Sequence, residues 1–83
     1  MSSIQDKIDY DNKYDVLYCL IDDTSNSYGD ELDSNIVLLR DIDTEKVTGI
    51  TVLDFKRSFC RNKQIAITLN KYFNVSEILA LLN

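Results

Sequence analysis

Acidic side chains gather around one polar segment of this chain, where carboxylates could bind a metal ion. Oxygen-ligand sites for Ca²⁺ and Mg²⁺ are built from such clusters. The spacing matches no calcium-binding loop, because the fixed glycine and the terminal glutamate are missing. We therefore interpret these residues as solvated loop charge, with a small metal-binding protein or enzyme that uses the acidic loop 22–33 as the alternative. The five acids are Asp22, Asp23, Asp30, Glu31 and Asp33.

Two cysteines offer the other candidate chemistry. Cys60 lies beside Arg57 and Arg61, whose charge could lower the pKa of the thiol and produce a reactive thiolate. The simpler interpretation, which we prefer, is a small side chain on a helix. Cys19 and Cys60 stand 41 positions apart, a separation that fits no common metal motif. Because polar sequence follows Met1 directly and no signal peptide is recognisable, we expect two reduced thiols in a cytoplasmic protein.

The residue types that are missing exclude several catalytic mechanisms. The 83 residues contain no histidine, which rules out serine–histidine and cysteine–histidine catalysis. Two glycines and no glycine-rich run leave no phosphate-binding loop or dinucleotide fingerprint. We expect a non-enzymatic protein with no catalytic residue, no cofactor and no metal.

The charge is acidic overall and unevenly distributed. A net charge of −5 argues against nucleic acid as a partner. Residues 1–45 hold twelve of the fourteen acids and three of the nine bases, so a basic protein is a conceivable partner for this half. Residues 56–63 are basic, and there we prefer a charged outer face over a phosphate-contacting patch. The bases are Lys56, Arg57, Arg61 and Lys63.

Apolar runs in the first two thirds of the chain predict an antiparallel sheet. Runs rich in strand-forming residues and bounded by aspartates predict strands, and "DTEK" (43–46) suits a tight hairpin connection. The polar stretch 24–30 reads as a loop. No apolar run approaches the roughly 20 residues of a membrane span, so no membrane contact is expected. The expected strands are 7–10, 15–22, 35–42 and 46–55.

The pattern changes to helices toward the C-terminus. Residues 54–63 are expected to form a short helix with Asp54 as N-cap. Residues 64–69 alternate apolar and polar, which predicts a last strand. Residues 74–83 are the clearest helix, with Asn74 as N-cap. The fold class is therefore α+β, a single small domain over 1–83 with an antiparallel sheet of four to five strands and one or two short helices near the C-terminus.

The stretch "YDNKYDVLY" (10–18) could be a helical stripe or a turn between strands. Three tyrosines recur every four residues, as on one face of a helix. Asp11 and Asn12, however, are turn formers, because their side chains bond to their own backbone. A helix here would run without a breaker into the strand-type residues that follow. We therefore predict a turn over 11–14, closed by Asp15.

The central strands are apolar on both faces, which predicts a partner. A sheet with one face in water should alternate apolar and polar residues. Two short helices can cover one face, and we expect a second copy, in a dimer, to cover the other. The alternatives are that the helices split between the faces or that the sheet curls on itself. The predicted interface is Val16, Tyr18, Leu20, Ile36 and Leu38.

Residues 8–55 resemble a known family. A tyrosine–aspartate pair, a short turn and an aspartate–x–leucine–tyrosine run are followed later by a glycine–isoleucine strand. This pattern is similar to the small bacterial proteins catalogued as domain of unknown function 2283. The matching residues are Tyr10, Asp11, Asp15, Leu17, Tyr18, Gly49, Ile50 and Val52.

The chain departs from that family at two positions, and its tail from residue 56 lies outside the pattern. Thr51 stands where the family usually has an acid, so any chemistry of that acid is missing here. Cys19 stands where isoleucine is usual. The resemblance implies a small cytoplasmic bacterial or phage protein with no established activity. It also implies an antitoxin-like or accessory role, because members are found beside small toxin-like ribonucleases.

Overall fold

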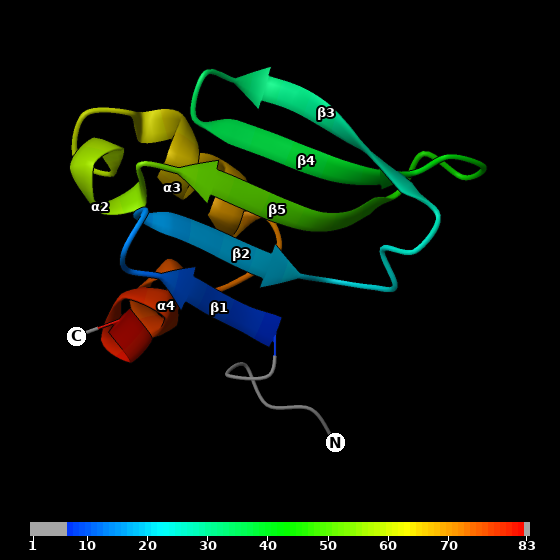
Figure 1. Cartoon of the computed structure of the whole chain (residues 1–83). Helices are drawn as coiled ribbons and strands as arrows, with labels where there is room; N and C mark the ends of the chain where they lie inside the picture. The colour runs from blue at the N-terminus through cyan, green and yellow to red at the C-terminus, as the bar shows by residue number, and fades with distance from the viewer. Residues whose placement is uncertain (1–6, 83) are drawn as a thin grey trace.

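The structure is a computed structural model that describes residues 7–82. In this range five strands form one antiparallel sheet in the order β1-β2-β5-β4-β3, and three short helices follow (Figure 1). This confirms the predicted α+β fold. The strands are β1 (Ile8–Asp11), β2 (Val16–Leu20), β3 (Ser27–Asp33), β4 (Ile36–Asp41) and β5 (Val47–Leu53); the helices are α2 (Phe55–Ser58), α3 (Lys63–Asn70) and α4 (Val75–Leu82).

The predicted turn between β1 and β2 is confirmed, and one aspartate shapes it. The Asp11 Oδ1 atom accepts hydrogen bonds from the backbone amides of Lys13 and Tyr14, at 3.0 and 3.3 Å. Asp15 closes the turn in the left-handed region, with φ of 57°, which aspartate tolerates better than most residues. Asp41 accepts from the amides two and three residues later in the same way, at the start of the hairpin connection between β4 and β5.

Strand β3 was not predicted, because its sequence is polar on both faces. The segment "SYGDELD" was interpreted in part as a loop, yet it pairs with β4 over its whole length. It is an edge strand with an irregular register between Glu31 and Asp33. Charges and bulges on an edge strand discourage pairing with other chains. Those same charges remove the apolar alternation that identifies a strand in a sequence.

The predicted strand over 64–69 was wrong, and this segment is α3. The Asn62 side chain accepts a hydrogen bond from the Gln64 amide and caps the helix. Ile65 and Leu69 are fully buried at helical spacing, whereas Ile67 is half exposed. The apolar residues therefore fit both a period of two and a helical face, and contact with the sheet selects the helix.

Helix α4 begins as predicted. The Asn74 Oδ1 atom accepts a hydrogen bond from the Ser76 amide at 2.9 Å, which confirms the N-cap. Val75 and Ile78 bury one face of the helix. Among residues 7–82 no single helix is long and apolar enough to cross a membrane, although α3 and α4, bent by 111° at their break, pass that test as a pair by length and composition.

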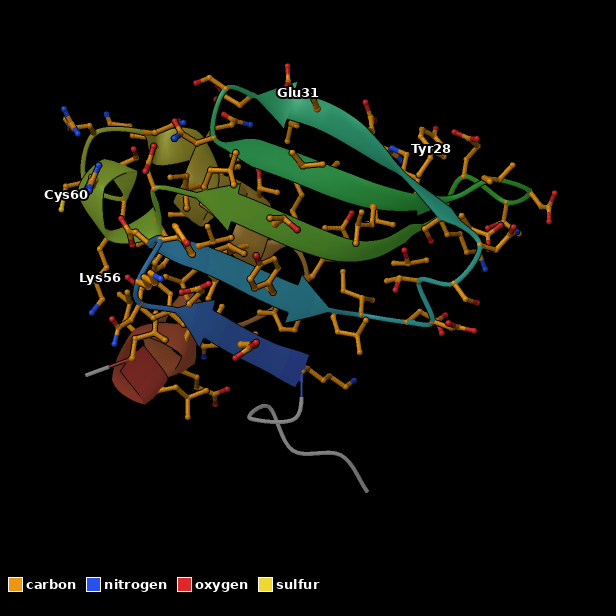
Figure 2. The ribbon with its side chains drawn as sticks, in the orientation of Figure 1. Tyr28, Glu31, Lys56 and Cys60 are labelled. Carbon is orange, nitrogen blue, oxygen red and sulfur yellow. The ribbon has the colours of Figure 1, made fainter. Side chains whose placement is uncertain are left out.

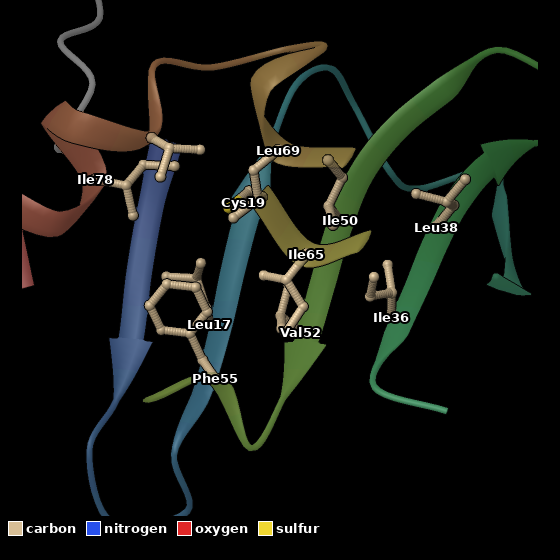
Figure 3. Close-up of a cluster of buried hydrophobic side chains, with 11 residues drawn as sticks. Leu17, Cys19, Ile36, Leu38, Ile50, Val52, Phe55, Ile65, Leu69 and Ile78 are labelled. Carbon is tan, nitrogen blue, oxygen red and sulfur yellow. The ribbon is translucent and has the colours of Figure 1, made fainter. Parts of the chain in front are cut away.

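The core lies between one face of the sheet and the helices (Figure 3). Alternate residues of β2, β4 and β5 point toward α3 and α4, and Phe55 of α2 closes one end. Within residues 7–82, the opposite face of the sheet carries no helix (Figure 1). The helices therefore do not split between the faces. The buried hydrophobic residues are Leu17, Cys19, Ile36, Leu38, Ile50, Val52, Phe55, Ile65, Leu69, Val75 and Ile78.

Candidate interaction surface

The uncovered side of the sheet forms a continuous surface, which we call the open face. The strand register places Asp9, Tyr18, Thr51, Val37 and Glu31 in one row across all five strands. Side chains in such a row share one side of the sheet. The open face thus has an apolar middle and an acid at each edge. Its central members are Val16, Tyr18, Leu20, Val37, Leu39, Thr51 and Leu53.

Two residues of the predicted interface lie on the other side. Ile36 and Leu38 pair with Val52 and Ile50 and are buried beneath the helices, with 0% and 5% of their surface exposed. Val37 and Leu39 take their places on the open face. Val16, Tyr18 and Leu20 of the predicted set do lie there.

The error concerns which side of β4 faces the helices. All four residues from Ile36 to Leu39 are apolar, so composition could not indicate which two face the core. The hairpin that joins β4 to β5 determines which side of β4 faces the helices. The register of this strand pair shifts between Leu39 and Arg40. A shift of one residue exchanges the two sides of a strand, and it is set by turn geometry that the sequence pattern does not show.

A glycine on the central strand and a nearby hollow interrupt the apolar side chains of the open face. Gly49 lies between Leu20 and Leu39 in the row of paired residues. A Cβ atom at this position would come within 3.1 Å of both the Cys19 carbonyl oxygen and the Leu39 side chain. The hollow is about 250 Å³, and Tyr18, Leu20, Leu39 and Thr51 are among the residues that line it.

Three large apolar residues of the open face are exposed. Tyr18, Leu20 and Leu53 expose 45%, 44% and 40% of their surface. The rim is acidic on balance, with Asp9 and one base, Lys7, on the β1 side of the hollow. Glu31 lies on the β3 edge (Figure 2). Contiguous apolar patches on a protein surface commonly mark interaction sites.

Asp15 is the most connected acid of the "YDNKYDVLY" stretch, and its role is structural. Its carbonyl oxygen accepts from the Phe55 amide at 2.9 Å, Oδ1 from the Lys56 amide at 2.9 Å and Oδ2 from the Arg57 amide at 3.1 Å. The first amides of a helix lack partners within the helix, and one residue serves three of them here. Asp54, the predicted N-cap, makes no side-chain capping bond and has a left-handed backbone.

Tyr10 completes this cluster. Its hydroxyl donates to Asp15 Oδ1 at 2.6 Å, and this hydrogen bond, burial and the nearby carboxylate charges raise the pKa of Tyr10 to about 12. Burial raises the pKa of Asp15, but the hydrogen bonds from Tyr10, Lys56 and Arg57 outweigh it, so the pKa lies below its ordinary value. With both oxygens occupied, Asp15 is unsuited to act as a proton-abstracting base.

The acids of the loop 22–33 are dispersed among local partners. Asp23 accepts from the amide and hydroxyl of Ser25. Asp30 forms an ion pair with Arg40 at 2.8 Å, and Asp33 accepts from the side chain of Asn62 at 3.3 Å. Within residues 7–82, no three or more Asp, Glu, His or Cys side chains come close enough to hold a metal ion.

The thiols and the basic residues lie apart from the open face. Cys19 is buried in the core, and this burial raises its pKa to about 12. Cys60 is exposed just beyond α2 (Figure 2). Helix α2 covers four residues, much less than the predicted 54–63, so the bases divide among α2, the turn that follows it and the first residue of α3. We call Lys56, Arg57, Arg61 and Lys63 the basic corner.

Comparison of the chain with models of known protein families, with curated proteins and with solved structures finds no match.

Proposed function

We propose that this chain is a non-enzymatic interaction domain whose open face binds the open face of a second copy. The exposed apolar middle of a sheet that has helices on one side only carries the proposal. Tyr18 and Leu20 line a hollow that a partner's side chain can fill, and Leu53 is exposed on the same face. Homodimers with two-fold symmetry are the commonest soluble assemblies.

The size of the open face suits a small dimer. Five strands about 4.8 Å apart and roughly 20 Å long give a face of roughly 500 Å² per chain. Two such faces approach the total of about 1,000 Å² that a specific interface needs. Burying each large apolar side chain contributes about 1.5 to 3 kcal/mol before the cost of association. The expected dimer is therefore of moderate affinity.

Sedimentation velocity from micromolar to millimolar concentration tests the proposal. The unmodified chain is expected to shift from monomer to dimer over this range. The double variant Tyr18→Thr/Leu20→Thr keeps strand-forming residues and should remain a monomer. Ile67→Thr is the matched control, because it removes exposed apolar surface from α3 and should dimerise like the unmodified chain. A chain that stays monomeric throughout would refute the proposal.

The acidic rim adds a second test. A symmetric face-to-face dimer brings the acids of the two rims near one another, at either edge. Asp9 and Glu31 should therefore weaken the dimer at low salt, and added salt should tighten it by screening. Dimerisation that weakens with salt would instead indicate an interface built on opposite charges.

A basic protein partner is the second candidate for the open face. The same acidic rim favours it, since opposite charges across an interface select partners and speed association. The resemblance to a family found beside toxin-like ribonucleases adds an antitoxin-like or accessory role in a bacterial or phage cytoplasm. Affinity capture from the source cells, repeated with Tyr18→Thr/Leu20→Thr, tests it. A basic protein retained equally by both baits would not be bound through the open face.

A further inference from the structure

A second apolar recess lies between α2 and α4, on the helix side of the molecule. Its volume is about 230 Å³, and apolar side chains from both helices form its walls. Phe55 is fully buried at its base, while Phe59, Leu79 and Leu82 are partly buried against the core. This groove, below the size of a typical drug pocket, suits one or two anchoring side chains of a macromolecule.

One base, Lys56, lines the groove, and the segment that carries it is basic in an otherwise acidic protein. Lys56 and Cys60 line it directly, and both lie at the end of the molecule formed by α2 (Figure 2). Residues 54–63 carry four bases and one acid, whereas the rest of the chain carries five bases and thirteen acids. The one acid, Asp54, lies 3.9 Å from Arg57, and both side chains are exposed. A partner for this groove therefore carries negative charge beside its apolar anchors.

The walls of the groove also restrict the secondary structure that a bound partner can adopt. On the α2 side the backbone groups are already bonded, because Asp15 and Asp54 accept from the four amides of the helix, and the Phe55 and Ser58 carbonyls accept from the residues that follow. An extended peptide would find few backbone partners here, in contrast to the edge of a sheet. A helical partner satisfies its own amides and presents apolar side chains at i, i+3 and i+4 to such a groove.

From the apolar walls, the basic segment and the helical lining, we propose that the groove between α2 and α4 binds an acidic amphipathic helix of a partner protein. The apolar face of that helix fills the space between Phe59 and Leu79. Its flanking carboxylates lie toward Lys56 and the rest of the basic corner. This site shares no residue with the open face, so it is independent of the dimer proposed above.

Cys60 provides a reporter at the edge of the groove. It is the exposed cysteine, whereas Cys19 is buried and its pKa is raised to about 12. The rate of alkylation of Cys60 by iodoacetamide, a neutral reagent, can therefore be followed by mass spectrometry. A helix seated in the groove covers the thiol and slows this reaction.

The probe is a capped 14-residue helical peptide with leucines on one face and glutamates on both flanks. At saturation it is expected to slow alkylation of Cys60 about fivefold. A peptide of the same composition with the leucines spread around the helix is the control and should give no protection. Protection should weaken as salt is raised, opposite to the trend expected for the dimer.

Variants separate the groove from general charge effects. Lys56→Gln/Arg57→Gln should raise the dissociation constant of the peptide roughly fivefold, in the range expected for two surface ion pairs. Lys46→Gln/Lys71→Gln makes the same charge change elsewhere and should alter it less than twofold. Tyr18→Thr/Leu20→Thr should bind the peptide unchanged.

Three outcomes would overturn the proposal. The first is that the peptide leaves the alkylation of Cys60 unchanged. The second is that the two peptides protect equally, or that both double Lys/Arg variants lose affinity to the same extent. The third is that a basic helix, an anionic vesicle or a nucleic acid duplex protects Cys60 better than the acidic helix does.

Discussion

The Asp15 carboxylate accepts a hydrogen bond at 2.9 Å from the backbone amide of Lys56, 41 positions away in the sequence. This bond joins the turn between β1 and β2 to the first turn of α2. Tyr10 reinforces it from both sides, since its hydroxyl donates to Asp15 and the Lys56 ammonium lies 5.1 Å from its ring centre. The tyrosine and aspartate of the "YDNKYDVLY" stretch therefore fix the position of α2 against the sheet.

Two aspartates of that stretch should respond differently to the same substitution. In Asp15→Asn one acceptor becomes an amide donor that faces a backbone amide, and we expect a loss of about 2 to 4 kcal/mol in unfolding free energy. Asp11 accepts both of its hydrogen bonds through Oδ1. An asparagine oxygen can replace that atom, so Asp11→Asn should change stability by less than about 0.5 kcal/mol. Urea unfolding followed by circular dichroism measures both, and equal losses would contradict the assignment.

Stability should fall in acid because of the same group. The pKa of Asp15 is lower in the folded chain than its ordinary value of 3.8, so its contribution is complete above that value. It is lost as the pH falls through the lowered folded pKa, because the unfolded chain takes up the proton first. The pKa of Asp41 is lowered too, by the amides of Thr44 and Asp43.

Thermal melts between pH 6 and pH 2 check this expectation. The unmodified chain should lose more stability below about pH 4 than Asp15→Asn does, because the variant lacks one of the titrating groups. Subtracting one curve of stability against pH from the other removes the contribution of the overall charge to the loss of stability. Parallel curves would show that Asp15 is not a source of the acid sensitivity.

Thr68 offers a stabilising substitution. Its hydroxyl oxygen is buried and has no hydrogen-bond partner in the described part of the chain, residues 7–82. Thr68→Val keeps the shape and replaces the hydroxyl by a methyl group, which should raise the unfolding free energy by about 1 kcal/mol. Both residues are β-branched, so their helix propensities are similar. A decrease in the melting temperature would indicate that the hydroxyl is satisfied in solution.

The two thiols should differ sharply in reactivity. Burial raises the pKa of Cys19 to about 12, and the side chain is 4% exposed. Only the thiolate reacts, so at pH 8 one equivalent of a thiol reagent should be consumed, at Cys60. Cys19 should react after unfolding in urea. Two fast equivalents in the native protein would contradict the burial of Cys19.

The sequence predicted the elements that carry a strong pattern and missed those that depend on distant residues. The strands β1, β2, β4 and β5 have apolar residues between clear turn formers, and α4 has its capping asparagine. Strand β3 is polar because it lies at an edge. The apolar residues of segment 64–69 fit both the two-residue period of a strand and one face of a helix, and packing against the sheet favours the helix.

The residues of the open face were predicted only in part, because they also depend on residues that are distant in the sequence. Tyr18 and Leu20 do lie on the face without helices, but β2 is as continuously apolar as β4, so its sequence does not indicate which alternate residues face the core. The prediction placed Ile36 and Leu38 on the wrong side of the sheet, because a run of four apolar residues does not indicate which alternate residues face the core. The groove beside Cys60 was not predicted, because it exists only where α2 and α4 approach each other.

The order of the strands has a consequence for how the chain folds. The pairs β1–β2, β3–β4 and β4–β5 are neighbours in the sequence, but β2–β5 joins Val16 to Leu53. Such a distant pairing has a high entropic cost of loop closure and tends to limit the folding rate. The hydrogen bonds of Asp15 lie just beyond the end of this strand pair at which Val16 pairs with Leu53. We expect these hydrogen bonds to form after the two strands have paired, so that Asp15→Asn accelerates unfolding and leaves the folding rate nearly unchanged in stopped-flow measurements. The residue then acts mainly on the lifetime of the folded state.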